Sequence, residues 1–193
     1  YDPQYSPEEH PFSLISAPQD RDKVALAIKD SGDYTHRFQT LQPGVKASVE
    51  GPHGGMWHVQ EGMHDKTVSM VMFAGGIGIT PMLGILENSA HLQFPNRMVL
   101  VWSLKSQEEY GFTDKLQSLK DRLPDFRLAP FFANESGFLD EGKIDKILQD
   151  NEIRYEAAEY LLCGPPPFMN AVEAVLLKKG VSKDRIHYET FGL

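Results

Sequence analysis

Residues 68–86, VSMVMFAGGIGITPMLGIL, decide the fold of this chain. They begin with a continuous apolar run, Val68–Phe73, which is typical of a strand buried on both faces of a sheet. The stretch carries no charge and is about long enough to span a bilayer. However, it holds four glycines and a proline, and this punctuation favours a strand, a tight turn and a helix over a transmembrane helix.

Strand and helix patterns alternate after this stretch. Helical spacing of apolar residues is found in Pro81–Ala90, Glu108–Leu123, Lys143–Gln149 and Pro166–Lys179. Further short apolar runs are found in Met98–Leu104, Arg127–Ala133, Tyr160–Cys163 and Arg185–Tyr188. Such alternation predicts an α/β fold, a doubly wound parallel sheet of about five strands with helices on both faces.

The residues before this stretch have a different pattern. Short apolar or alternating runs at Phe12–Ala17, Val24–Lys29 and Val45–Glu50 are separated by Gly, Pro, Ser and Asp, which is typical of antiparallel strands. Gly51–Asp65 is expected to be a loop. We therefore predict an antiparallel β domain over residues 1–64 and a nucleotide-binding α/β domain over residues 65–193.

Composition excludes several classes of function. The net charge of −8 leaves no basic stripe to neutralise phosphates, so nucleic acid is not an expected partner. The single cysteine, Cys163, excludes a disulfide framework and a cysteine-rich zinc site and favours a reducing, intracellular setting. His53, His58 and His64 match no metal-binding spacing, and we interpret them as loop histidines rather than metal ligands.

The glycine-rich turn Phe73–Pro81 is the sharpest local feature. Glycines allow the backbone to turn tightly and to approach a ligand where a Cβ atom would clash. Thr80 is expected to cap the following helix, and Pro81 suits its first position. The free N–H groups and the helix dipole would then favour a pyrophosphate. The alternative is a tight strand–helix turn that binds nothing.

A second feature is Leu162-Cys163-Gly164-Pro165-Pro166, where a strand ends and a helix starts within the prolines. Parallel strands end at the ligand crevice in such sheets, so Cys163 is expected to lie there. The alternative is a cysteine buried as a small apolar residue.

Six short motifs occur in one order along the chain: HPFS at 10–13, GDYT at 32–35, GPHGG at 51–55, GGIGITP at 75–81, CGPPP at 163–167 and ETF at 189–191. Together they resemble the dehydrogenase domain of the NADPH oxidase and ferric reductase family, a branch of the ferredoxin–NADP reductase superfamily. The resemblance extends from His10 to Phe191. It implies that part of an antiparallel flavin-binding β-barrel, lacking its N-terminal strands, precedes the nucleotide-binding domain.

The resemblance also implies roles for residues near FAD. Ser13 would reach the flavin N5 atom, Glu189 would lie near the redox centre, and Phe191 would shield the flavin ring and yield to the nicotinamide. The remaining flavin-side residues are expected beside the ring, at the FAD phosphates or in the loop facing the nucleotide: His10, Pro11, Phe12, Lys29, Thr35, Gly51 and Gly54.

For the nucleotide side, the resemblance implies that Cys163 lies near the nicotinamide. The residues expected to hold the rest of NAD(P)H lie in the two glycine-containing loops: Gly75, Gly76, Gly78, Thr80, Pro81, Gly164 and Pro165. Lys105, followed by Ser106, is expected where a cation would pair with a 2′-phosphate, which favours NADPH over NADH. The alternatives are that Lys105 is a solvated surface charge, or that Glu108 or Glu109 favours NADH.

The activity implied by the resemblance is hydride transfer from NAD(P)H to FAD, followed by single-electron transfer to a haem. That haem would lie in a transmembrane part of the parent protein, with this chain at the cytoplasmic face of the membrane and dioxygen or ferric iron as the final acceptor. One alternative is a soluble flavin reductase that passes electrons to an iron–sulfur or haem protein. Another is a nucleotide-sensing module without catalysis.

Overall fold

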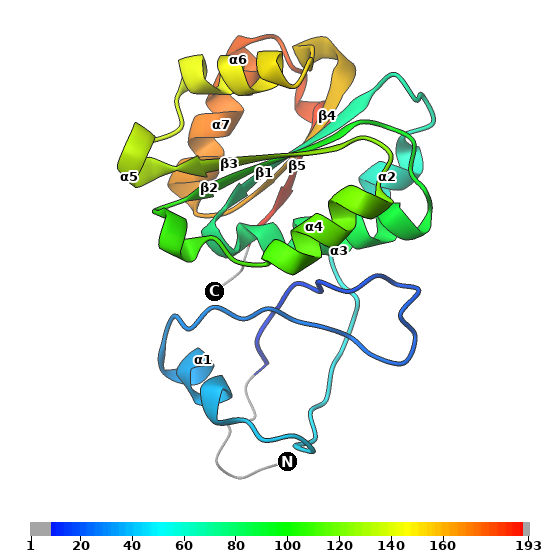
Figure 1. Cartoon of the computed structure of the whole chain (residues 1–193), viewed down its shortest axis with the longest axis vertical. Helices are drawn as coiled ribbons and strands as arrows, with labels where there is room; N and C mark the ends of the chain where they lie inside the picture. Colours follow the sequence, from blue (N-terminus) through cyan, green and yellow to red (C-terminus); the bar gives the residue numbers. More distant parts are fainter. Residues whose placement is uncertain (1–8, 191–193) are drawn as a thin grey trace.

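The structure, a computed structural model, describes residues 9–190. Its centre is a five-stranded sheet with the order β3-β2-β1-β4-β5, in which all neighbouring strands are parallel (Figure 1). The strands are β1 Ser69–Gly75, β2 Met98–Leu104, β3 Phe126–Phe132, β4 Ala158–Cys163 and β5 Ile186–Glu189. The predicted α/β fold with a doubly wound parallel sheet is confirmed.

Helices cover both faces of the sheet, with α3 and α4 on one face and α6 and α7 on the other (Figure 1). The α-helices are α1 Asp33–Arg37, α2 His58–Gly62, α3 Ile79–His91, α4 Thr113–Arg122, α5 Ala133–Ser136, α6 Glu141–Asp150 and α7 Pro166–Lys178. Short 3-10 turns are η1 Phe38–Thr40, η2 Gly76–Gly78, η3 Gln107–Glu109, η4 Tyr155–Ala157 and η5 Lys183–Arg185.

Residues 68–86 form β1, η2 and the start of α3, as the sequence predicts. Within residues 9–190, no helix is both long enough and apolar enough to cross a membrane. The predicted helix over 108–123 is divided into η3 and α4. The reason is Phe112, which has a left-handed backbone with φ of 56° immediately before α4.

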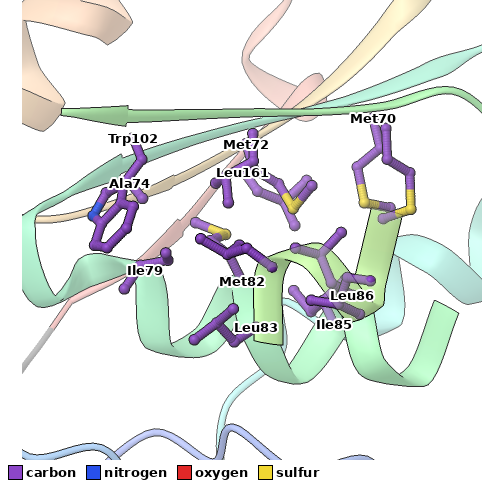
Figure 2. Close-up of a cluster of buried hydrophobic side chains, with 14 of the residues drawn as sticks. Met70, Met72, Ala74, Ile79, Met82, Leu83, Ile85, Leu86, Trp102 and Leu161 are labelled. Atoms are coloured by element: carbon purple, nitrogen blue, oxygen red, sulfur yellow. The ribbon is translucent and has the colours of Figure 1, made fainter. Parts of the chain in front are cut away.

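The core consists of two layers, one on each face of the sheet. The larger layer packs alternate residues of β1 and β2 against α3, including Met70, Met72 and Met82, which are fully buried (Figure 2). Trp102 closes this layer at the end where α3 begins. The strands are buried on both faces, which explains why they are continuous apolar runs in the sequence.

The predicted strands before residue 65 are wrong. Over residues 9–67 the structure has a single antiparallel bridge, Leu14↔Leu26, and no strand ladder. A strand is stable only where neighbouring strands satisfy its N–H and C=O groups, and an isolated pair is marginal in water. The alternating pattern of Val24–Lys29 and Val45–Glu50 therefore gives no strand ladder, and Val24 and Val49 are more than half exposed.

This first segment nevertheless packs closely on α3. A Cβ atom at Gly84 would lie 2.6 Å from the carbonyl oxygen of Leu14, so glycine allows the segment to touch the helix backbone. One turn further along α3, Gln19 donates a hydrogen bond of 2.9 Å to Asn88. The carboxamide of Gln60, in α2, bonds both Asn88 and Ser89. These contacts hold the first segment beside the α/β layer.

A buried ion pair joins α3 to α4 and predicts a pH dependence of stability. Glu87 is 9% exposed and receives hydrogen bonds from Lys115 at 2.5 Å and Arg122 at 2.8 Å. Burial alone would raise the pKa of Glu87, but the hydrogen bonds and charges of these two cations lower it. A carboxyl group whose pKa is lowered on folding stabilises the native state above its unfolded pKa. This contribution is lost as the pH falls through the lowered, folded pKa.

We expect Glu87→Gln to lower the free energy of unfolding at pH 7 by about 1–3 kcal/mol, because charge-assisted hydrogen bonds to two cations are lost. The difference from the unmodified chain should shrink as the pH falls below the ordinary glutamate value of 4.5. Urea unfolding at pH 7 and pH 3.5 measures this. The control is Glu141→Gln, the same change in a more exposed pair with Lys178 and Lys179, and it should cost much less at pH 7. Equal losses would contradict the expectation.

Candidate functional site

The candidate site lies at the carboxyl ends of β1 and β4. The chain order of the strands reverses between these two neighbours, and in open α/β sheets ligands bind in the crevice at such a point. Two loops meet there: residues 76–78 between β1 and α3, and residues 164–165 between β4 and α7. The sequence identified both loops, and the sheet brings them together.

The two loops touch through their backbones. A Cβ atom at Gly78 would lie 2.2 Å from the carbonyl oxygen of Cys163, and one at Gly164 would lie 2.9 Å from the Cα atom of Gly75. At Gly75, a Cβ atom would lie 2.9 Å from the ring of Phe168 and 3.0 Å from Pro165. The sequence suggested that glycines in these loops allow the backbone to approach a ligand. At these three glycines the backbone instead lies close to other residues of the protein.

Gly76 differs from these three glycines. Its φ of 54° is left-handed, and a Cβ atom there would have no other heavy atom within 4 Å. This backbone conformation favours glycine, and the open space beside Gly76 is where a ligand could reach the loop.

The predicted capping role of Thr80 is wrong. The helix begins at Ile79 with Gly78 as its N-cap, and the Thr80 hydroxyl donates a hydrogen bond of 3.0 Å to the carbonyl of Ile77. The reason is that the chain enters α3 through η2, so helical geometry begins before Thr80. Pro81 is the third residue of α3 rather than the first. Its missing N–H costs no helical hydrogen bond, because the first four amides of a helix have no partner within it.

Ser13 and Glu189, predicted from distant motifs, are in direct contact. The Ser13 hydroxyl donates a hydrogen bond of 2.9 Å to the Glu189 carboxylate. Glu189 is the last residue of β5 and pairs with Cys163 at the end of β4. Its other carboxylate oxygen would lie 3.8 Å from a Cβ atom at Gly54. The HPFS, GPHGG and ETF motifs therefore converge beside the two loops.

The side chain of Cys163 lies in the core rather than in the crevice. Its side chain is fully buried and belongs to the core layer under α3. Burial, with the nearby negative charge of Glu189, raises the pKa of the Cys163 thiol to about 12. The thiol is therefore protonated near neutral pH and is not a nucleophile. Its backbone, in contact with Gly78, is what reaches the crevice loops.

The aromatic residues of the first segment form a cluster. The His10 ring stacks on Tyr34 with centroids 3.6 Å apart, and Phe12 and Tyr34 both contact Phe38. Pro11 is exposed beside them. The Thr35 hydroxyl accepts from the Ser31 N–H and donates to the Gly32 carbonyl, so it closes a local turn.

The two lysines expected at phosphate groups both contact Glu109. Lys29 Nζ is 3.8 Å from Glu109 Oε1, whereas Lys105 contacts this carboxylate through its backbone N–H, which donates to Glu109 Oε2 at 3.1 Å. The structure thus brings Lys29, expected at FAD, beside Lys105, expected at NADPH. A hydrogen bond with Ser106 lowers the pKa of Glu108.

Two other predicted residues lie apart from these contacts. Gly51 is exposed in the loop before α2 and has a φ of 134°. Phe191 lies outside the described residues.

Trp102 is a residue of the site that the sequence motifs do not indicate. This residue is 2% exposed, and its indole N–H donates a hydrogen bond of 2.9 Å to the carbonyl of Gly76 in the turn. A buried tryptophan almost always needs a partner for its N–H. A tryptophan near the end of an apolar strand is therefore a sequence signal for a hydrogen bond to a nearby loop, and this signal could have identified Trp102.

The comparisons with known proteins bear on the family and the fold. Residues 72–174 match the family model described as the oxidoreductase NAD-binding domain. The chain is 27% identical to a flavohemoprotein of Rhizobium meliloti, covering 94% of this chain and 47% of the relative. It is 23% identical to the toluate 1,2-dioxygenase electron transfer component of Pseudomonas putida, covering 96% of this chain and 55% of the relative. It thus spans about half the length of these curated relatives.

Among solved structures, a ferredoxin NADP+ reductase from Neisseria gonorrhoeae with bound FAD and NADP superposes with a TM-score of 0.72. The identity is 23%, and the match covers 94% of this chain and 79% of the other. A likeness at this identity establishes the fold.

Proposed function

The chain belongs to the oxidoreductase NAD-binding domain family and has the ferredoxin reductase-like fold, and from this premise we propose that it is the reductase part of a flavin-dependent NAD(P)H oxidoreductase. Its reaction is hydride transfer from NAD(P)H to FAD. The observation that carries this proposal is the hydrogen bond between Ser13 and Glu189, at the crevice where the strand order reverses. A polar pair at this place supports catalysis rather than nucleotide sensing alone.

The residues at the β1–α3 turn fit the pyrophosphate of a dinucleotide. Gly76 is open on its outer side, and α3 presents the positive end of its dipole to the same place. We assign Gly75, Gly76 and Gly78 to this turn, with Thr80 and Pro81 in the first turn of the helix, and Gly164 and Pro165 in the facing loop. Cys163 supports the nicotinamide end through its backbone contact with Gly78.

The first segment fits a flavin. Ser13 and Glu189 provide a hydroxyl and a carboxylate, and Gly54 leaves space beside them. His10 and Phe12 belong to an aromatic cluster that offers flat surfaces to a ring. Bound FAD would supply the hydride acceptor and the capacity to release electrons singly. Glu189, which accepts the hydrogen bond of the Ser13 hydroxyl, would orient this side chain beside that acceptor. This assigns residues 1–64 to flavin and 65–193 to NAD(P)H, with Lys29, Thr35 and Gly51 at the flavin and Phe191 as the shield of its ring.

The electron acceptor separates two candidate functions. The motif resemblance favours a haem in a transmembrane part of a longer protein, with dioxygen or ferric iron as the final acceptor and this chain at the cytoplasmic face. The names of the curated relatives, a flavohemoprotein and an electron transfer component, favour the other candidate, a soluble reductase that passes electrons to a partner protein or domain. Both candidates share the same hydride step, so the first experiment addresses that step.

The test is anaerobic. The purified chain is mixed with excess FAD, then with NADPH or NADH in separate cuvettes, and bleaching of the oxidised flavin band is followed. Bleaching faster than in a protein-free control supports the reductase. Calorimetric binding of both FAD and NAD(P)H without bleaching would overturn it and favour a sensing module. Oxidised cytochrome c or a ferric chelate added after bleaching then distinguishes the acceptors by their rates of reduction.

Coenzyme preference gives a second prediction. We expect Lys105→Glu to raise the dissociation constant for NADPH about tenfold, which corresponds to about 1.4 kcal/mol, because the substitution replaces a positive charge at the 2′-phosphate with a negative one. The effect on NADH, which has no 2′-phosphate, should be much smaller. Glu109→Gln should tighten NADPH, since the carboxylate bonded to the Lys105 N–H would repel that phosphate. Glu108→Gln is the matched control, because Glu108 bonds Ser106 instead. Calorimetric titration with each coenzyme measures this, and equal effects on both would remove Lys105 from the site.

A further inference from the structure

A side chain of the neighbouring strand β2 forms a hydrogen bond with the turn between β1 and α3. Trp102 lies on β2 in register with Ala74 of β1, the residue just before the glycines. Its ring is in the core layer under α3 (Figure 2). Its N–H donates a hydrogen bond of 2.9 Å to the carbonyl of Gly76. The same carbonyl accepts the N–H of Ile79 at the start of α3. Two donors therefore fix the direction of this one carbonyl.

Fixing that carbonyl also fixes the next amide. A trans peptide is planar, so the N–H of Ile77 points opposite to the C=O of Gly76. The carbonyl points inward to the indole, so the amide points outward, toward the open side of Gly76. Outward backbone N–H groups at the start of a helix are the donors that a pyrophosphate accepts from. Without the hydrogen bond from Trp102, the peptide between Gly76 and Ile77 could rotate, because glycine populates positive and negative φ with similar ease.

The indole also connects the turn to the chain that follows β2. The Trp102 ring contacts Tyr110 with centroids 5.4 Å apart and Phe112 with centroids 6.2 Å apart. Tyr110 in turn contacts Phe132 at the end of β3. The indole is thus held by rings on one side and donates to the turn on the other.

We propose that Trp102 is a positioning residue for the dinucleotide: its indole N–H holds the Gly76–Ile77 peptide so that the Ile77 amide faces the pyrophosphate. This inference rests on the proposed binding of NAD(P)H. Trp102 does not touch the reacting atoms, so its loss should weaken binding without slowing the hydride step at saturation.

The direct test is Trp102→Phe, which keeps an aromatic ring in the cluster and removes the donor. We expect the dissociation constant for ADP-ribose, a pyrophosphate without nicotinamide, to rise about three- to tenfold by calorimetry, the factor expected for one net hydrogen bond. KM for NAD(P)H should rise by a similar factor while kcat is unchanged. Trp57→Phe is the matched control, because Trp57 is 42% exposed and contacts His58, and it should change neither quantity.

A second measurement does not depend on the stability of Trp102→Phe. In a Trp57→Phe chain with 15N-labelled tryptophan, one indole N–H signal remains and belongs to Trp102. We expect this signal to exchange slowly with solvent and to shift when ADP-ribose is added. If ADP-ribose binds but the signal exchanges fast and does not move, and Trp102→Phe binds normally, the positioning role is wrong and the proposed function stands. If the unmodified chain binds neither ADP-ribose nor NAD(P)H, the proposed function itself is wrong.

Discussion

Gly78→Ala is expected to destabilise the fold by about 3 kcal/mol and to abolish nucleotide binding. The added methyl group would lie 2.2 Å from the carbonyl oxygen and 2.5 Å from the carbonyl carbon of Cys163. Both partners are backbone, so no side-chain rotation relieves the clash, and the loops after β1 and β4 must separate. Overpacking a well-packed site commonly costs 1–3 kcal/mol, and a backbone clash belongs at the upper end of that range. Urea unfolding and titration with ADP-ribose measure the two effects.

Gly76→Ala is the matched control, two residues away in the same turn. A Cβ atom there meets nothing within 4 Å, so the cost is that of a left-handed alanine, about 1–2 kcal/mol. The fold should be retained, and nucleotide affinity should fall less than in Gly78→Ala. Equal stability of the two variants would mean that the loops are not packed backbone to backbone as the structure has them.

Glu189→Ala and Ser13→Ala are each expected to slow flavin bleaching by NAD(P)H about a hundredfold at saturating coenzyme. The Ser13 hydroxyl donates to the Glu189 carboxylate at 2.9 Å, so removing either leaves the other without its partner at the crevice. Loss of correct positioning at a reacting centre can cost about a hundredfold in rate. The double variant should be little slower than either single variant, because residues that act as a unit are not additive. Anaerobic stopped-flow measurement of the bleaching rate tests both expectations.

Glu159→Ala is the control for this pair. Glu159 is a carboxylate on β4, one strand from Glu189, but it bonds His187 at 2.9 Å rather than Ser13. It should leave the bleaching rate within about twofold of the unmodified chain. The affinity for NAD(P)H should be unchanged in all of these variants. A bleaching rate unaffected in Ser13→Ala, with FAD bound, would remove the pair from the reaction and favour a nucleotide-sensing role.

Local pattern was sufficient to predict the strands of the α/β part of the chain. Continuous apolar runs gave the five strands to within one or two residues at most ends, and Met98–Leu104 was predicted with the bounds that the structure has. Glycine and proline marked the two turns because backbone conformation is a local property. The predicted strands of the first segment were wrong because period-2 alternation indicates which face a strand would bury, whereas a strand forms only when it pairs with other strands. The predicted start of α3 was wrong because the 3-10 turn η2 continues directly into the helix.

The sequence by itself determined the strand–helix order, the two glycine turns and the residues expected around them, because these depend on neighbours along the chain. Only the tertiary structure decided which of them meet. Ser13 reaches Glu189 across 176 positions, and Lys29 lies at Glu109. Trp102 reaches Gly76 from the next strand, and Gly78 lies against the backbone of Cys163. These last two contacts follow from the parallel register of β1, β2 and β4, which aligns strand ends that are far apart in sequence.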